Sequence, residues 1–285
     1  MNPRVSVLLS VYNGEEYIKE AVESILNQTF QNFEFIIIDD GCTDDTALIL
    51  NSFNDPRIVR VVNEKNLGLV RSLNKGLRIA KGEFIARMDA DDTSTKDRLE
   101  KQVAFLDANK DVGVLGTWMK QVDSKGKAIS IFKVPVSHDE ILWQMLSGTA
   151  IVHASVLMRR DVLMEVGGYN EDFPHVEDTE LWSRLIFITR FANLSEVLYI
   201  RRIHNNSIMS ANFKLQIEQS EKIREKLLLL FLEKNMITAR EAQKVREKQS
   251  KNNIFIGVAR FLLPAPFRHK LNSSLHRLLS YFTSR

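Results

Sequence analysis

The chain has 285 residues, of which 44% are hydrophobic and 26% charged. This is the composition of an ordinary globular protein, and it excludes collagen-like and disordered chains. The longest apolar run, Leu227–Leu232, is far shorter than the roughly 20 residues of a membrane-spanning helix, which excludes a multi-span membrane protein. Charge is unevenly distributed, because residues 1–211 hold 24 basic and 30 acidic side chains, whereas residues 251–285 hold six basic and none acidic. The acidic body argues against a nucleic-acid partner.

The single cysteine, Cys42, excludes an internal disulfide and a structural zinc site, and it favours a reducing compartment. The apolar stretch Val5–Val11 is followed at once by Glu15 and Glu16, which does not fit a signal peptide. These two features predict a cytoplasmic protein.

The first hundred residues alternate between strand and helix patterns. Apolar, β-rich segments predict four strands: Arg4–Val11, Phe33–Ile38, Ile58–Val62 and Glu83–Met88. Between the strands, apolar residues spaced by three and four predict helices, as at Ile18, Val22 and Ile25. Strands that alternate with helices in this way predict an α/β fold with a parallel sheet.

From about residue 96 the pattern becomes less regular. The expected elements are a helix at Lys96–Asn109, a strand at Val112–Met119, a hairpin or loop at Gln121–Lys133, a strand at Ala150–Met158, a helix at Thr179–Ile188, a strand at Ser195–Arg201 and two charged helices at Phe213–Lys234 and Thr238–Lys248. We therefore expect one domain over residues 1–211, a helical extension over 212–250 and a basic tail over 251–285.

Four polar clusters lie at the ends of the predicted strands. They are residues 10–13, Asp39–Asp40, Asn63–Gly68 and Asp89–Asp92. Ligand sites of parallel sheets lie beyond the carboxyl ends of the strands, so we expect these clusters, with five carboxylates, at one edge. Such carboxylates repel one another unless a cation or hydrogen-bond donors compensate, and oxygen ligands suit Mg²⁺ or Mn²⁺ bound to a substrate diphosphate. Neither a P-loop nor a dinucleotide-binding glycine motif follows the first strand.

An ordered set of motifs extends from about residue 4 to residue 207. Its members are Val5–Gly14, Ser24–Phe30, Ile38–Thr46, Asn66–Gly68, Asn74–Gly76, Gly82–Ile85, Asp89–Asp92, Gly167–Tyr169, Glu177–Asp178 and Leu181–Trp182. In this order they resemble the family 2 glycosyltransferases, which have the GT-A fold, a Rossmann-like α/β fold that binds nucleotide sugars. Cys42 stands where serine is usual in that family, and the motif around it is otherwise intact.

The resemblance implies how a nucleotide would be bound. Asp40 corresponds to the residue that accepts a hydrogen bond from uracil N3, and Ser10 and Tyr12 would line the same base. Arg71 would approach the base or the phosphates, and Asp89 matches the carboxylate beside the ribose. Taken alone, Asp39–Asp40 would be an ordinary polar turn.

The resemblance also implies the groups around the reacting bond. Asp91 matches the direct ligand of Mn²⁺ or Mg²⁺, the adjacent Asp92 serves the metal or the ribose, and His204 falls near the diphosphate. Asp178 matches the base that deprotonates the acceptor hydroxyl, with Glu177 in support. Taken alone, these two would be acidic residues of a first helical turn.

The basic tail has its own pattern. Over residues 267–282 apolar side chains follow helical spacing, with basic side chains and no acidic ones between them. Such an amphipathic helix fits an anionic inner-membrane surface. The alternative is a helix packed on its own domain or on a partner in a homo-oligomer.

We therefore expect an inverting glycosyltransferase that moves a hexosyl residue from a nucleotide sugar to a hydroxyl of a glycan or lipid-linked glycan, with UDP as the expected nucleotide. Two alternatives stay open. A nucleotidyltransferase would usually carry a basic glycine-rich loop where this chain has Tyr12–Glu16. A non-catalytic adaptor of a glycan pathway would retain the fold alone.

Overall fold

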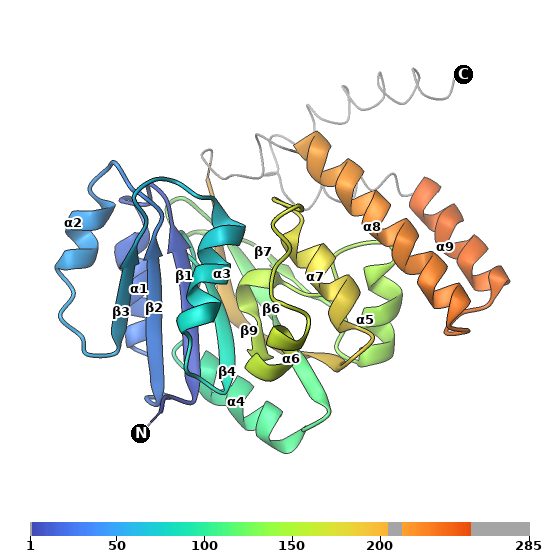
Figure 1. Cartoon of the computed structure of the whole chain (residues 1–285), viewed down its shortest axis with the longest axis horizontal. Helices are drawn as coiled ribbons and strands as arrows, with labels where there is room; N and C mark the ends of the chain where they lie inside the picture. The colour runs from blue at the N-terminus through green and yellow to red at the C-terminus, as the bar shows by residue number, and fades with distance from the viewer. Residues whose placement is uncertain (1, 205–212, 252–285) are drawn as a thin grey trace. The chain divides into compact units, whose positions relative to one another are not determined.

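The computed structural model describes residues 2–204 and 213–251, and the strands of this part share one sheet (Figure 1). In chain order the strands are β1 (Val5–Val11), β2 (Phe33–Asp39), β3 (Ile58–Val62), β4 (Phe84–Asp89), β5 (Thr93–Ser94), β6 (Val112–Asp123), β7 (Ala128–Phe132), β8 (Leu157–Arg159) and β9 (Arg190–Ile203). The helices are α1 (Ile18–Leu26), α2 (Thr46–Asn51), α3 (Leu69–Ile79), α4 (Arg98–Ala108), α5 (His138–Met145), α6 (Arg160–Glu165), α7 (Glu177–Leu185), α8 (Phe213–Glu233) and α9 (Ala239–Lys251).

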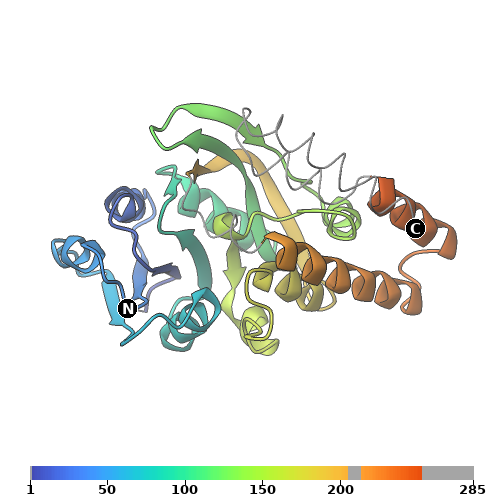
Figure 2. The same ribbon diagram turned by 90° about the horizontal axis from the view of Figure 1, so that it is seen from above.

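The strand order is β3-β2-β1-β4-β8-β6-β9-β5, and β7 pairs with β6 beside this path. β1 pairs in parallel with β2 and β4, and β2 pairs in parallel with β3, as the sequence predicts. The second half of the sheet is mixed, because β8 runs antiparallel to both β4 and β6. Helices α1 and α3 cover opposite faces of the parallel strands (Figure 2), which explains why these strands are apolar on both faces.

One predicted strand is wrong. The segment Ala150–Met158 forms a loop with a short 3₁₀ turn at His153–Ser155, and only its end joins the sheet, as β8. Ala150, Ile151 and Val152 are buried in this loop. A short buried apolar run gives the same pattern whether or not it pairs as a strand, which is why the sequence suggested one. The short helices α5 and α6 were not expected either.

The chain divides into two compact units, Met1–Met145 with Thr149–Ile223, and Leu146–Gly148 with Arg224–Arg285. In the second unit, Arg246 of α9 pairs with Glu225 of α8 at 2.6 Å. Helix α9 begins with a reciprocal cap, in which Thr238 N donates to Glu241 Oε2 at 2.8 Å and Glu241 N donates to Thr238 Oγ1 at 3.3 Å. The two helices expected after residue 211 are thus confirmed in the described residues.

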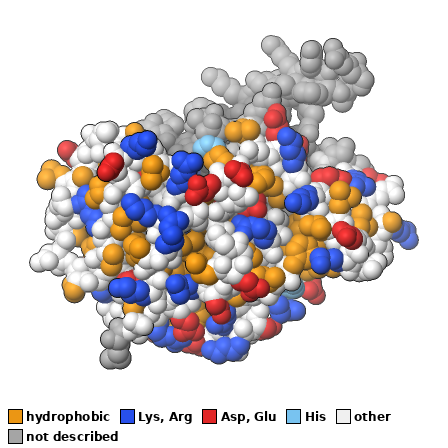
Figure 3. Space-filling view, in the orientation of Figure 1, with side chains coloured by type: hydrophobic (Ala, Val, Ile, Leu, Met, Phe, Trp, Pro, Cys, Tyr) orange, Lys and Arg blue, Asp and Glu red, His pale blue; other side chains and the backbone are white. Residues whose placement is uncertain are grey.

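The basic tail predicted over residues 251–285 lies outside the described residues except for Lys251. Among the helices that the structure describes, none combines the length and the apolar stretch needed to cross a lipid bilayer. Acidic and basic side chains are interspersed on the face of the molecule drawn in Figure 3.

The parallel strands supply the core that holds the site, and the contribution of a core side chain to the free energy of unfolding can be measured. Leu9 of β1 is fully buried between Ile37 and Met88 of the neighbouring strands, whereas Leu48 of α2 is 69% exposed. We expect Leu9→Ala to lower the free energy of unfolding by about 2–5 kcal/mol, because it leaves a cavity. The matched control Leu48→Ala should change it by less than about 0.5 kcal/mol. Urea denaturation followed by tryptophan fluorescence checks this, and equal effects of the two variants would contradict it.

Candidate active site

The carboxyl ends of the parallel strands meet at one edge of the sheet. Ser10 of β1 lies beside Asp89 of β4 in the register, and Val11 of β1 lies beside Asp39 of β2, which in turn pairs with Val62 of β3. The polar residues that follow these strands are therefore neighbours in space, although up to about 80 residues separate them in sequence. This is the edge where the sequence places the ligand.

Asp40, directly after β2, is buried and its carboxylate is held by three donors. Its Oδ1 accepts from Asn63 Nδ2 at 2.7 Å and from Leu67 N at 2.9 Å, while its Oδ2 accepts from Gly68 N at 2.9 Å. A carboxylate offers about four acceptor positions. Asp40 thus has a fixed orientation and capacity for one further donor.

Three residues behind Asp40 support it, and the sequence assigned a role to none of them, although it placed Asn63 at this edge. Lys75 Nζ donates to Asn63 Oδ1 at 2.6 Å, and Asn63 Nδ2 also donates to Ser72 Oγ at 3.0 Å. These bonds fix the Asn63 amide with its NH₂ group toward Asp40. Gly41 allows the two loops to approach, because its φ is +75° and a Cβ there would lie 2.6 Å from the Lys65 backbone. A signal was present, since Asn63 follows a predicted strand and Lys75 lies in a quoted motif.

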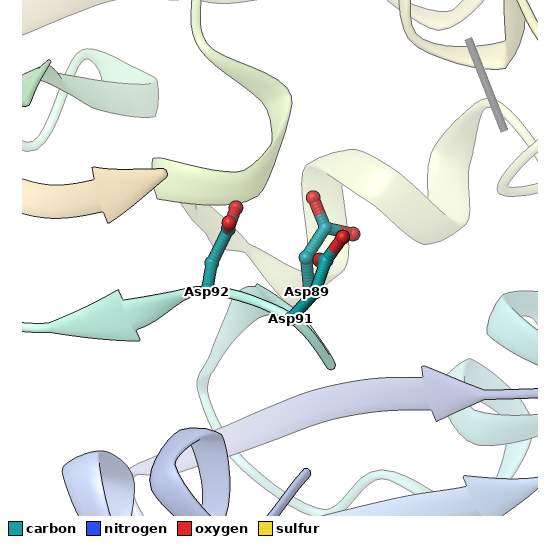
Figure 4. A group of neighbouring side chains, drawn as sticks. All are labelled: Asp89, Asp91 and Asp92. Atoms are coloured by element: carbon teal, nitrogen blue, oxygen red, sulfur yellow. The ribbon is translucent and has the colours of Figure 1, made fainter. Parts of the chain in front are cut away.

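Three carboxylates gather beyond β4 (Figure 4). Asp89 ends the strand, and Asp91 and Asp92 lie on the loop to β5. One ligand oxygen from each lies within 4.8 Å of the others. Closely spaced carboxylate oxygens are the ligands that Mg²⁺ and Mn²⁺ prefer, so the donor set fits the predicted ion.

Each of these carboxylates has its own partner. The buried Arg87 forms an ion pair with Asp89. His204 Nε2 lies 2.9 Å from Asp91 Oδ2. Asp92 Oδ1 accepts from the backbone N of Arg202 at 2.7 Å. The partners come from β4 and from the end of β9, so the site depends on elements more than one hundred residues apart.

The three carboxyl groups differ in how readily they ionise. Burial and the negative charges of Asp91 and Asp89 raise the pKa of Asp92 well above its usual value. Burial also acts to raise the pKa of Asp91, but the hydrogen bond and charge of His204 outweigh it and lower the pKa of Asp91 below the usual range. Of Asp89, Asp91 and Asp92, Asp91 therefore keeps its negative charge most firmly.

The side chain of Arg202 fastens the end of β9 to this loop. Its guanidinium donates to the Asp91 carbonyl at 3.3 Å and to the Ser124 carbonyl at 3.2 Å. It also pairs with Glu20 and lies over the Tyr17 ring, 4.5 Å from its centroid. The position of His204 against Asp91 depends on these contacts.

Glu177 and Asp178 begin α7, as the resemblance implies. Glu177 is buried, and Asp178 accepts from Thr179 N at 2.6 Å. Burial and the charge of Asp178 raise the pKa of Glu177 to about 7. His153 Nδ1 lies 3.9 Å from Glu177, but burial and the charge of Arg87 lower the pKa of His153 well below its usual value. Glu177 therefore faces a neutral imidazole.

Tyr169 and Glu177 both lie against His153. The Tyr169 OH is 2.8 Å from His153 Nε2. Burial raises the pKa of Tyr169, and the charges of Glu177, Asp178 and Asp89 raise it further. His153 contacts both Tyr169 and Glu177, and Val156, three residues later, accepts a backbone hydrogen bond from Arg87 of β4 at 3.1 Å, so the start of α7 lies close to the end of β4.

The remaining predicted residues lie around the same edge. Ser10 is half-buried at the end of β1, and Tyr12 is exposed just beyond it. Arg71, in the first turn of α3, forms an ion pair with Glu171 at 3.0 Å. Arg71 is thus paired with the loop that precedes α7.

Comparison with known proteins identifies the family. The model of the family described as "Glycosyl transferase family 2" matches residues 6–167. The chain belongs to this family. An uncharacterized glycosyltransferase of Haemophilus influenzae is 35% identical over 243 residues, which cover 81% of this chain and 75% of that protein. The Escherichia coli UDP-Glc:alpha-D-GlcNAc-diphosphoundecaprenol beta-1,3-glucosyltransferase WfaP is 32% identical over 222 residues, 76% of this chain and 84% of that protein.

The fold agrees with this assignment. The crystal structure of S. aureus TarS in complex with UDP-GlcNAc superposes with a TM-score of 0.64 at 25% identity, covering 80% of this chain and 71% of that one. The expected GT-A fold and family are therefore confirmed. The chain is a glycosyltransferase, and the nucleotidyltransferase alternative is disfavoured.

The raised pKa of Glu177 has a consequence for stability. The folded chain keeps this proton to about pH 7, whereas unfolded Glu loses it near 4.5. Between these values the folded state binds more protons, so stability falls as pH rises through the window. Glu177→Gln cannot ionise and should be more stable than wild type above pH 7, by at most about 3 kcal/mol.

Urea unfolding at pH 5, 6, 7 and 8 in EDTA measures this difference. The stability advantage of Glu177→Gln should shrink steadily as pH falls. Glu165→Gln, at the exposed end of α6, is the matched control. A difference between Glu177→Gln and wild type that does not change with pH would contradict the prediction.

Proposed function

We propose that the chain transfers a hexosyl residue from a UDP-linked sugar to a hydroxyl of a glycan or lipid-linked glycan, with inversion at the anomeric carbon. The observation that carries the proposal is the convergence of Asp40, the carboxylates at residues 89–92 and the pair Glu177–Asp178 around one sheet edge. The printed names of the relatives support it, because WfaP is named for UDP-Glc and a diphosphoundecaprenol-linked acceptor, and TarS was solved with UDP-GlcNAc.

The donor's uracil is bound beside Asp40. Three protein groups donate to the Asp40 carboxylate, and the uracil N3–H donates to its remaining acceptor position. Ser10 and Tyr12, at the end of β1, line the base. Because the loop bonds fix the carboxylate in advance, little ordering is needed when the nucleotide binds.

Asp91 would hold a divalent cation, with Asp89 and Asp92 beside it. Mn²⁺ or Mg²⁺ bound there would supply positive charge against the leaving diphosphate. His204 orients the Asp91 carboxylate for this task, and Arg87 does the same for Asp89.

Asp178 accepts the proton of the acceptor hydroxyl as that oxygen attacks the anomeric carbon. A sugar hydroxyl needs such a base near neutral pH, and a positioned base contributes roughly 10²–10⁴-fold to the rate. Glu177, which keeps its proton to about pH 7, adds no second full charge beside the base. A single base with direct displacement produces inversion.

The division of the chain into a catalytic domain over residues 1–211, an extension over 212–250 and a basic tail over 251–285 is part of the proposal. We infer that the tail meets the cytoplasmic face of the inner membrane, where lipid-linked acceptors are exposed. Its charge supports this, with six basic and no acidic residues over 251–285.

The test is a panel of UDP-, GDP-, dTDP- and CMP-sugars, each with Mn²⁺ and with EDTA. Binding is measured by thermal shift, and donor hydrolysis is measured by nucleotide release. Asp91→Asn should abolish metal-dependent binding of the UDP-sugar. Asp178→Asn should keep binding but lose about 10²–10⁴-fold of the release rate.

Asp139→Asn, an exposed carboxylate in the first turn of α5, is the control and should match wild type. Absence of nucleotide binding to the wild-type chain under every condition would overturn the proposed donor site. Full release by Asp178→Asn would overturn the assignment of the base.

A further inference from the structure

Asn74 of α3 holds a backbone segment that is 95 residues away in sequence. Its Oδ1 accepts from Tyr169 N at 3.0 Å, and its Nδ2 donates to Tyr169 O at 2.8 Å. One amide side chain thus satisfies both backbone groups of a single residue, as a neighbouring strand would. Asparagine and glutamine are the only side chains with an amide donor and acceptor, and two bonds fix orientation as well as position.

The chain around Tyr169 is shaped for this contact. Gly167 and Gly168 have φ values of +77° and +74°, which L side chains rarely adopt. A Cβ at Gly168 would lie 2.9 Å from Asn74 Oδ1, closer than real Cβ atoms approach. The two glycines therefore turn the chain after α6 and keep the path to Asn74 clear.

A second link joins the same segment to α7. Arg184 Nη1 donates to the Val166 carbonyl at 2.6 Å, and its Nη2 donates to the Gly168 carbonyl at 2.7 Å. Glu180, one turn earlier on α7, holds the Arg184 guanidinium through both carboxylate oxygens. Helix α7 is thus fastened to the segment that Asn74 fastens to α3.

The neighbouring residue of α3 serves the other side of the site. Lys75 supports Asn63, which in turn donates to Asp40 at the expected uracil position. Adjacent residues of one helix, Asn74 and Lys75, therefore contact the segment that precedes α7 and the loop that holds Asp40. Helix α3 therefore links the segment before α7 to the loop that holds Asp40.

We propose that Asn74 is a positioning residue, which sets the place of Asp178 relative to the bound donor through Tyr169 and Arg184. The inference rests on the base role of Asp178 proposed above. We call the two hydrogen bonds between Asn74 and the Tyr169 backbone the clamp. A base displaced by a fraction of an ångström still leaves the nucleotide site intact. Loss of the clamp should therefore lower turnover and leave donor binding unchanged.

The test uses Asn74→Leu in the full chain, which keeps the side-chain volume and removes both bonds. Release of UDP from UDP-glucose, UDP-galactose, UDP-GlcNAc and UDP-GalNAc is measured with Mn²⁺, together with the Kd of UDP and the melting temperature. We expect at least a tenfold fall in the release rate, with the Kd of UDP within twofold of wild type. Asn109→Leu, which removes one backbone bond at the end of α4, is the matched control for stability.

A second variant tests the route. Arg184→Lys keeps a positive charge beside Glu180 but cannot donate to the Val166 and Gly168 carbonyls together, a pair of bonds that we call the fork. If the clamp and the fork act in series, losing either one loosens the same link between α3 and α7. The double variant Asn74→Leu with Arg184→Lys should then be no more than twofold slower than the slower single variant.

The outcomes separate this inference from the proposed function. A wild-type chain that releases UDP from none of the four sugars overturns both. A wild-type rate retained by Asn74→Leu overturns the positioning role alone. So does a parallel loss of rate, UDP affinity and melting temperature beyond that of Asn109→Leu, because it indicates a structural role. Effects that multiply in the double variant overturn the route through Arg184.

Discussion

Repulsion between carboxylates is the constraint on which this site depends. Five of them crowd the carboxyl edge of the parallel strands, and a sheet edge with that charge is unstable unless each is compensated. The compensating groups are Arg60 for Asp39, the Asn63 amide and two loop N–H groups for Asp40, Arg87 for Asp89, His204 for Asp91 and the Arg202 backbone for Asp92. Because the partners come from several elements, the edge keeps its shape only when the whole sheet is formed.

The five carboxylates are compensated by different kinds of groups, and this difference determines which ligand each of them suits. Asp40 is held by neutral donors that leave one acceptor position, which suits a nucleobase N–H group. Asp91 keeps its charge most firmly of the three and is half-buried, so it is the carboxylate of this cluster best suited to a cation. At the start of α7, burial and the charge of Asp178 raise the pKa of Glu177, whose neighbour His153 is neutral. Helix α3 contacts the segment before α7 through Asn74 and supports Asn63, a partner of Asp40, through Lys75.

Much of the donor side could be predicted from the sequence. The four parallel strands are short apolar runs that end in polar residues, and the topology of a parallel sheet gathers those ends without further information. Arg87 could have been found in the same way, since it is two residues before Asp89 and thus on the same face of β4. Helix α7, with its acidic first turn, was also correctly placed.

The rest depends on contacts that leave no local pattern. Asn74 acts on a backbone amide 95 residues away, and no periodicity in the sequence reports such a partner. The loop around His153 resembles a strand because it is apolar and buried, yet its buried side chains pack without strand pairing. The mixed order of β8, β6 and β9 follows from the crossing of distant segments, which propensity cannot specify.

The central claim is that one sheet edge binds a uridine nucleotide at Asp40 and a divalent cation at Asp91. The most direct measurement is a crystal structure of the full chain with UDP and Mn²⁺, with the metal located by its anomalous scattering. The account predicts an anomalous peak in contact with Asp91 and the diphosphate, and uracil N3 within hydrogen-bonding distance of the Asp40 carboxylate. A peak away from residues 89–92, or a base bound away from Asp40, would contradict it.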